Sequence, residues 1–370
     1  FRLGRGVCSE KPTKMSIFSH SPGSRVPRPV DSTPGFLSER CLPHPGRHLS
    51  IYIWLAFFYN KHENEAPRQR GFVLGGTIMS FSIFVDGSSN LPGEILRKLD
   101  ISILPCSYSM NGVPSTYDGC LDTFDSHEYY EMLRQGGKVQ TSLLNTQLFL
   151  DAFRPVLERG EDVVYFSMSS GISGTYQAAK IAAEELMETY PERTVRVVDS
   201  LGSGFGTGLM ACKAADLRAA GKDARETADI MDEDAQHTLQ FFTVDDLNFL
   251  KRTGRVSGAT AMIGTVLNIK PVLWGDPTGH ITARCKARGR KKAMAAIVEE
   301  YKKFVEDAGS QRVAISHGDC PEDAQLLADM ITEAAKPMEL IIAPHEPFTG
   351  AHVGPGMLAL FFHGKKRDSQ

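Results

Sequence analysis

The sequence has few of the features that mark disulfide-bonded, zinc-binding or membrane proteins. Its seven cysteines are an odd number and include no Cys-x-x-Cys pair, which argues against a disulfide framework and a zinc site. Within residues 1–78 the only strongly apolar run, Ile51 to Tyr59, is far shorter than the ~20 residues that cross a bilayer. It lies too deep in the chain for a secretory signal and has no small-residue cleavage site after it. We therefore expect a cytoplasmic protein with reduced thiols, no bound metal and no transmembrane segment.

Positive charge is also scarce in most of the chain. Residues 1–78 carry 11 Lys and Arg against 5 Asp and Glu, whereas residues 79–370 carry 30 against 39. An acidic body does not favour a nucleic-acid-binding surface. The composition, with 42% hydrophobic and 23% charged residues, is that of an ordinary globular protein, and the length allows two domains.

The first 78 residues differ from the rest of the chain. They carry 8 of the 20 prolines and 4 of the 11 histidines, with little sustained periodicity. Leu74-Gly75-Gly76-Thr77-Ile78 precedes Met79, and two glycine codons at this place could encode a ribosome-binding sequence. We hypothesise that Met79 is the true start and that residues 1–78 are a translated, non-native leader. The alternative is a genuine disordered extension.

From residue 81 onward, apolar runs alternate with helical patterns. We expect strands at 81–85, 101–104, 163–167, 195–198 and 239–244, and helices at 146–158 and 175–188. Strands that alternate with helices predict a mainly parallel sheet covered on both faces. This pattern defines an N-terminal α/β domain over residues 79–240.

The pattern changes after residue 245. Runs at 269–274 and 281–285 flank a Gly-Asp-Pro-Thr-Gly turn and predict a β-hairpin. A helix at 291–307, a strand at 312–316, a helix at 321–334, a strand at 339–343 and a closing apolar run at 357–362 follow. We expect a second α/β domain over residues 241–370.

Four polar or glycine-rich stretches end apolar runs. They are Gln140-Thr141-Ser142, Gly171-Ile172-Ser173-Gly174-Thr175, residues 246–257 (DLNFLKRTGRVS) and residues 350–356 (GAHVGPG). Their hydroxyls, glycine N–H groups and one histidine suit a small anionic head group at strand ends, where ligands of α/β folds usually bind. The four stretches indicate a protein that binds a small molecule.

Each stretch also has a purely structural interpretation. Ser173 precedes an expected helix whose N-terminus attracts anions, yet Ser173 or Thr175 could simply cap that helix. His352 stands in an expected glycine-bracketed turn, where it can hydrogen-bond a carboxylate, but a lone histidine is more often a surface or satisfied core residue. Lys251, Arg252 and Arg255 form a cationic stretch; such a cluster is usually a solvated face, but its glycine, threonine and serine neighbours lead us to expect a movable loop able to meet a phosphate or a partner protein.

Residues 202–208 (GSGFGTG) invite comparison with dinucleotide-binding loops. They fail the G-x-G-x-x-G pattern because Thr207 and Leu209 stand where the third glycine is needed. We expect instead a mobile, glycine-rich connection that lines a cavity.

Taken together and in order, these stretches resemble the DegV family, the fatty-acid-binding proteins that serve bacterial fatty acid kinase. The resemblance runs from Ser80 to the C-terminus and includes none of residues 1–78. The matching residues are 86–91 (DGSSNL), Thr141-Ser142, 169–177 (SSGISGTYQ), 197–200 (VVDS), 246–257, 267–271 (LNIKP) and 350–356.

The resemblance implies a two-domain α/β protein that buries one fatty acid between its domains and uses no cofactor. Thr141, Ser173 and His352 would hydrogen-bond the carboxylate, and the stretch with Arg252 and Arg255 would lie near the head group and the kinase. The sequence departs from the family at DGSSN, where an acidic residue commonly precedes the leucine. It also departs at Leu143-Leu144, which replace a more polar pair and change the expected entrance of the pocket.

The expected function is that of a non-catalytic carrier, which presents the bound carboxylate to an ATP-dependent fatty acid kinase for acyl-phosphate formation. An alternative is a serine hydrolase of acyl esters, because Ser173, Asp199 and His352 occur in the Ser, Asp, His order of α/β-hydrolases. Against it, the stretch around Ser173 is one residue short of G-x-S-x-G. A third interpretation, a kinase subunit in its own right, lacks a Walker-type phosphate loop. The sequence does not specify the length, saturation or branching of the acyl chain.

Overall fold

The computed structural model of the protein describes residues 81–256 and 268–368. The described residues belong to one compact unit of the chain. The proposed leader 1–78, its apolar run Ile51 to Tyr59, the Met79 start and Ser257 all lie outside them. None of the helices in the described ranges is long and apolar enough to cross a membrane.

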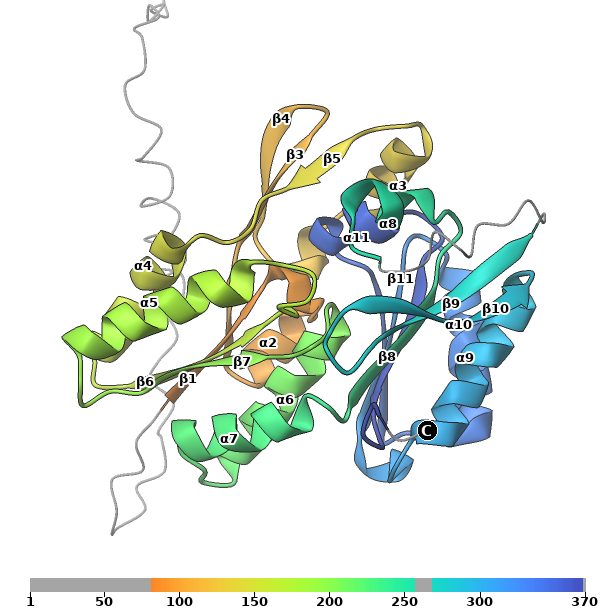
Figure 1. Cartoon of the computed structure of the whole chain (residues 1–370). Helices are drawn as coiled ribbons and strands as arrows, with labels where there is room; N and C mark the ends of the chain where they lie inside the picture. Colours follow the sequence, from red (N-terminus) through yellow and green to blue (C-terminus); the bar gives the residue numbers. More distant parts are fainter. Residues whose placement is uncertain (1–80, 257–267, 369–370) are drawn as a thin grey trace, which may run out of the picture. The chain divides into compact units, whose positions relative to one another are not determined.

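The first sheet has four strands, all parallel, in the order β2-β1-β6-β7 (Figure 1). The strands are β1 (Phe81–Asp86), β2 (Ile101–Leu104), β6 (Asp162–Ser167) and β7 (Val195–Asp199). Every residue of β6 is buried, as expected for a parallel strand with helices on both faces. The parallel sheet that the sequence predicts is therefore confirmed.

Alternate residues of β6 face two helical layers. Val163 and Tyr165 pack with α4 (Thr146–Glu158) and α5 (Thr175–Thr189). Val164 and Phe166 pack with α6 (Phe205–Ala219) and α7 (Ala224–Asp234) on the other face. A shorter helix, α2 (Gly93–Lys98), joins β1 to β2.

Helix α6 corrects one expectation. The glycine-rich stretch 202–208 is not a mobile connection, because Phe205 to Gly208 form the buried first turn of α6. A Cβ on Gly208 would lie 2.5 Å from the carbonyl oxygen of Ser89 and 2.9 Å from the Leu91 side chain. The glycine therefore lets the helix approach the loop after β1 closely.

The second sheet has six strands in the order β10-β9-β8-β13-β11-β12, and only β11 and β12 are parallel to each other. The strands are β8 (Thr238–Thr243), β9 (Ile269–Gly275), β10 (Ile281–Arg288), β11 (Arg312–His317), β12 (Glu339–Pro344) and β13 (Leu358–His363). The β9–β10 hairpin is confirmed. The domain division at residue 240 stays a prediction, and β8, which spans it, belongs to this second sheet.

Only one face of the six-stranded sheet is covered by its own helices. Phe241, Trp274 and Phe362 point to this face and pack with α9 (Arg290–Phe304) and α10 (Pro321–Ala334). The opposite face carries Phe242 and Phe361, which belong to the same core cluster as the parallel sheet and α6. That face is directed toward the first sheet.

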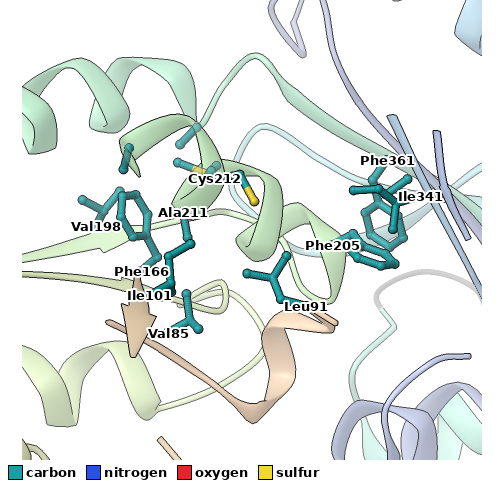
Figure 2. Packing of buried hydrophobic residues seen from close by; sticks show 14 of the residues in the cluster. Val85, Leu91, Ile101, Phe166, Val198, Phe205, Ala211, Cys212, Ile341 and Phe361 are labelled. Carbon is teal, nitrogen blue, oxygen red and sulfur yellow. The ribbon is translucent and has the colours of Figure 1, made fainter. Parts of the chain in front are cut away.

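Helix α6 contacts strands of both sheets. Figure 2 shows the shared core, with Val85, Ile101, Phe166 and Val198 from the parallel sheet, Phe205, Ala211 and Cys212 from α6, and Ile341 and Phe361 from the second sheet. The β9–β10 turn makes a further link, since Ser169 Oγ donates to the carbonyl of Gly279 at 2.8 Å. The two sheets thus share one core.

A three-stranded antiparallel sheet was not foreseen. It has the order β4-β3-β5 and consists of β3 (Cys106–Met110), β4 (Val113–Tyr117) and β5 (Val139–Thr141). These strands are short, and most of their residues are half-buried or exposed, so they lack a strong apolar pattern. The Asn111-Gly112 turn, with φ of 50° and 83°, is the signal that could have revealed the hairpin. Helix α3 (Ser126–Arg134) lies between β4 and β5 in the chain.

Candidate functional site

A cavity of about 460 Å³ lies between the loops that follow the parallel strands and the open face of the six-stranded sheet. Its wall is mostly apolar and includes Met168, Ile172, Phe242, Ile281, Phe348 and Phe361. The volume lies within the usual range of small-molecule sites. Leu143 and Arg255 line one end and are exposed to solvent, and we call this end the mouth.

The three residues expected to bind a head group all line this cavity. Thr141 ends β5, Ser173 lies in the turn before α5, and His352 lies in the last turn of α11 (Pro347–Val353). Thr141 Oγ1 and His352 Nε2 are 2.9 Å apart, within hydrogen-bond distance. The fold therefore joins residues that are 211 positions apart in the chain.

His352 does not stand in a glycine-bracketed turn, as its sequence context suggested. It belongs to helix α11, which has Pro347 at its first position and ends at Gly354 with a φ of 78°. The Phe249 ring packs where a Cβ of Gly354 would lie, so this glycine permits a close contact with the neighbouring helix. The proline-first, glycine-last arrangement is a common helix signal and could have been recognised in the sequence.

The His352 imidazole has one unused nitrogen. Burial, assisted by the nearby Arg255 charge, lowers the pKa of His352 from 6.5 to about 4, so the ring is neutral at neutral pH. Nδ1 is buried and has no hydrogen-bond partner among the described residues. In the tautomer that is protonated at Nδ1, Nε2 accepts from Thr141 and the N–H can donate to an acceptor oxygen of a ligand.

Ser173 has a structural role as well as a place in the cavity wall. Its hydroxyl donates to Thr175 Oγ1 at 3.0 Å and accepts from the Thr175 backbone N–H at 3.2 Å. The N-cap of α5 is Gly174 and makes no side-chain cap hydrogen bond, so neither Ser173 nor Thr175 is the cap, and the ligand interpretation of Ser173 stays a prediction. Gly174 packs close to Leu143, which brings the Ser173 turn beside the segment that follows Thr141.

The cationic stretch is partly helical rather than a simple loop, because residues Asn248–Thr253 form α8. The structure separates its two expected arginines. Arg255 lines the mouth of the cavity, whereas the Arg252 guanidinium lies over the Phe249 ring, 4.6 Å from its centre. Arg252 is exposed and does not line the cavity.

Two buried ionisable residues were missed, and one of them, His345, lines the cavity. His345 Nδ1 lies 2.9 Å from Ser316 Oγ and His345 Nε2 lies 2.8 Å from Thr349 Oγ1, and burial lowers the pKa of His345 to about 3. The Glu346 carboxyl caps α11 by accepting from the Thr349 backbone N–H at 2.9 Å. Burial raises the pKa of Glu346 to about 8. The two residues fix the helix that carries His352.

Contacts of Asp199 and His352 do not form a hydrolase triad. Asp199 accepts hydrogen bonds from the backbone N–H groups of Ser170 and Leu201, at 3.2 Å and 3.0 Å. His352 pairs with Thr141, and no hydrogen bond between these described residues joins it to Asp199 or Ser173. Residues 81–256 and 268–368 also contain no group of three or more His, Cys, Asp or Glu side chains placed to hold a metal ion.

Comparison with protein families gives one match over most of the chain. The model described as an uncharacterised protein of the DegV family matches residues 80–365. A DegV domain-containing protein of Clostridium perfringens is 35% identical over 292 residues, which are 78% of this chain and 99% of the relative. One from Lactococcus lactis is 31% identical over 289 residues, again 78% of this chain and 99% of the relative.

Solved structures show the same fold. A fatty-acid-binding DegV family protein of Thermus thermophilus matches with a TM-score of 0.70 and 27% identity, over 78% of this chain and 100% of that chain. A fatty acid binding DegV family protein of Streptococcus agalactiae matches with a TM-score of 0.67 and 25% identity, over 78% of this chain and 100% of that chain. In sequence and in fold, the chain belongs to the DegV family.

Proposed function

We propose that the protein is a cytoplasmic carrier that binds a long-chain fatty acid in this cavity, with the carboxylate at the mouth. The observation that carries the proposal concerns His352. Its Nδ1 is buried and unpartnered, and the residue lines an apolar cavity together with Thr141 and the cationic Arg255. A neutral imidazole N–H and a guanidinium can donate to a carboxylate, and Thr141, which donates to His352 Nε2, holds the imidazole in the tautomer with its proton on Nδ1.

The tail and the head group play different parts in binding. Burial of an acyl chain contributes ~0.8 kcal/mol per CH₂, so about 14 methylenes give roughly 11 kcal/mol before the costs of association. A carboxylate removed from water without partners would cost several kcal/mol. The polar groups at the mouth chiefly offset that cost and fix the orientation of the head group.

The fatty-acid-binding relatives of Thermus thermophilus and Streptococcus agalactiae support the choice of ligand. We further propose that the carboxylate is presented to a fatty acid kinase, which phosphorylates it to an acyl phosphate, and that the carrier performs no catalysis itself. The exposed side chains of Arg252 and Arg255 lie on the surface that this partner would contact. The family resemblance supports the kinase, and the absence of a bond between Asp199 and His352 disfavours ester hydrolysis.

The test starts with the full chain purified from bacterial cells. Organic extraction followed by mass spectrometry is expected to give stoichiometric fatty acid. The delipidated protein should regain octadecanoic acid and, with a fatty acid kinase and ATP, yield acyl phosphate. A protein that neither carries nor regains fatty acid would contradict the proposal. Hydrolysis of a chromogenic acyl ester that is lost in Ser173→Ala would instead favour the hydrolase.

A pair of serine variants tests whether Ser173 belongs to the head-group site. Ser173→Ala changes a residue that lines the cavity, whereas Ser142→Ala changes an exposed serine that does not. We expect slower acyl-phosphate formation or weaker fatty-acid binding only in Ser173→Ala. Equal behaviour of the two variants would remove Ser173 from the head-group site.

A further inference from the structure

The buried end of the cavity, away from the mouth, contains two polar side chains, Gln240 and Ser203, and beside them His345, whose ring nitrogens are already within hydrogen-bond distance of Ser316 and Thr349. Gln240 lies on β8 and Ser203 in the turn before α6, and both line the cavity. Phe361 and Ala359 of the neighbouring strand β13 line it beside them. We call this the inner end. Gln240 is only 7% exposed, whereas Leu143 at the mouth is 55% exposed.

The orientation of the Gln240 amide is fixed by a hydrogen bond. The backbone N–H of Ser203 donates to Gln240 Oε1 at 3.2 Å, which identifies the oxygen and leaves Nε2 as the other end of the amide. A Cβ on Gly202 or on Gly206 would lie 3.2 Å from this oxygen. The surrounding backbone is therefore packed closely around the Gln240 amide.

Two hydrogen-bonding groups at the inner end have no partner. The Ser203 hydroxyl is buried and unpartnered, and within the described part of the chain Gln240 Nε2 donates to no acceptor. Buried polar groups are nearly always paired, and an unpaired one lowers stability. A plain methylene chain against this wall would leave both groups without a partner.

We propose that the preferred ligand is a fatty acid whose acyl chain carries a hydroxyl group, and that Gln240 and Ser203 recognise it. This inference rests on the proposed fatty-acid-binding function. The ligand oxygen accepts a hydrogen bond from Gln240 Nε2, and its own proton is donated to Ser203 Oγ. One hydroxyl thus satisfies both groups, because it is a donor and an acceptor at once.

Charge argues against a carboxylate at the inner end. Among the described residues that line the cavity, Arg255 at the mouth has the only acidic or strongly basic side chain (Asp, Glu, Lys or Arg). Arg367 is buried near Gln240, but its guanidinium donates to the backbone carbonyls of Thr238, Leu201 and Asp276. An anion at this end would therefore lack a counter-charge in the wall, whereas a neutral hydroxyl does not need one.

The experiment compares ligands of equal chain length on the delipidated full chain. Affinities are measured by calorimetry for octadecanoic acid, 10-hydroxyoctadecanoic acid and 12-hydroxyoctadecanoic acid. We expect at least one hydroxy acid to bind roughly tenfold more tightly than octadecanoic acid. Octadecanoic acid that binds as tightly as both hydroxy acids would overturn this inference alone. Failure of all three to bind would overturn the proposed function with it.

Variants test whether Gln240 and Ser203 cause the preference for a hydroxy acid. Gln240→Met combined with Ser203→Ala should reduce the affinity ratio of hydroxy acid to octadecanoic acid to about one. Thr243→Val is the matched control, because the Thr243 hydroxyl is also buried and unpartnered but does not line the cavity. It should keep the wild-type ratio. A ratio that is unchanged in the double variant, or that falls equally in the control, would overturn the assignment.

Discussion

The two large sheets take part in the cavity in different ways. The parallel sheet is buried under helices on both faces. This part of the fold therefore lines the cavity with residues that follow the strands, such as Met168, Ser173 and Ser203. The six-stranded sheet has one face without helices of its own, and strand residues such as Phe242 and Phe361 form the wall directly. Under the proposed function, the difference teaches that the ends of elements and the turns between them, with Thr141 ending β5, Ser173 before α5 and His352 in α11, bind the head group while a strand face shapes the space for the tail.

Disruption of the layer shared by the two sheets should have the largest effect. In Gly208→Val, the new side chain would collide with the Ser89 carbonyl and with Leu91. We expect the free energy of unfolding to fall by about 3 kcal/mol, measured by urea denaturation. Gly309→Ala is the control, since a Cβ there meets nothing within 4 Å. Equal stability of the two variants would show that α6 is not tightly held between the sheets.

The junction between the sheets should respond to pH through Glu346. Asn90, in the loop after β1, accepts from the Glu346 backbone N–H at 2.7 Å and donates to the Pro344 carbonyl at 3.1 Å. The pKa of Glu346 rises from 4.5 to about 8 on folding, so the folded state binds more protons between these values. The stability that this group contributes is present below pH 4.5 and is lost as the pH rises through 8.

Glu346→Gln should remove this loss. We expect the wild-type free energy of unfolding to fall by on the order of 3 kcal/mol more than that of the variant between pH 5.5 and pH 8.5, measured by urea denaturation at each pH. Glu322→Gln, at an exposed position, should follow the wild type. On the acid side, the lowered pKa of His345 predicts a separate loss of stability as the pH falls from 6.5 toward 3. A Glu346→Gln profile parallel to the wild type would contradict the assignment.

At the mouth of the cavity, His352→Phe tests the proposed head-group chemistry. The ring size is kept while the hydrogen bonds are lost, so fatty-acid affinity should fall about 10-fold to 100-fold. Calorimetry with octadecanoic acid measures the change, and the alcohol octadecanol, which has no carboxylate, should be affected much less. An equal loss for acid and alcohol would mean that His352 shapes the cavity instead of binding the head group.

The smallest effect is expected from the arginine that does not line the cavity. Arg252→Ala removes a side chain stacked on Phe249 and should change fatty-acid affinity by less than about twofold, because an exposed cation–π contact contributes little. Arg255→Ala should weaken binding more, since Arg255 lines the mouth. Both variants are compared in the binding assay and in the kinase assay. The opposite order in the binding assay would reverse the roles given to the two arginines.

Residues that belong to strong local patterns could be predicted from the sequence. Apolar runs gave the parallel strands, and helix α4 has the predicted bounds, Thr146–Glu158. The polar stretches led to Thr141, Ser173, His352 and Arg255, which all line one cavity. Local chemistry at the end of an apolar run was sufficient for these positions.

Features that depend on long-range packing could not be predicted. The glycines at the start of α6 and around α11 suggested loops, because glycine is permissive in isolation and the partners that require it, Ser89 and Phe249, lie far away in the chain. Gln240 was simply a residue of an expected strand. Only the packing of the two sheets shows that the face of β8 with Gln240 lines a cavity, whereas the opposite face, with Phe241, packs on α9.

The hydrogen bond from Ser169 to Gly279 bears on how fast a ligand is exchanged. It ties the turn of the β9–β10 hairpin to the loop after β6, where a Cβ on Gly171 would lie 2.8 Å from the Gly279 backbone. Because the walls are joined there, we expect a ligand to enter and leave through the mouth beside Leu143. For the lipid carrier that we propose, residence time and selectivity would then be set at different places, so evolution or engineering could adjust how long a lipid is held without changing which lipid is chosen.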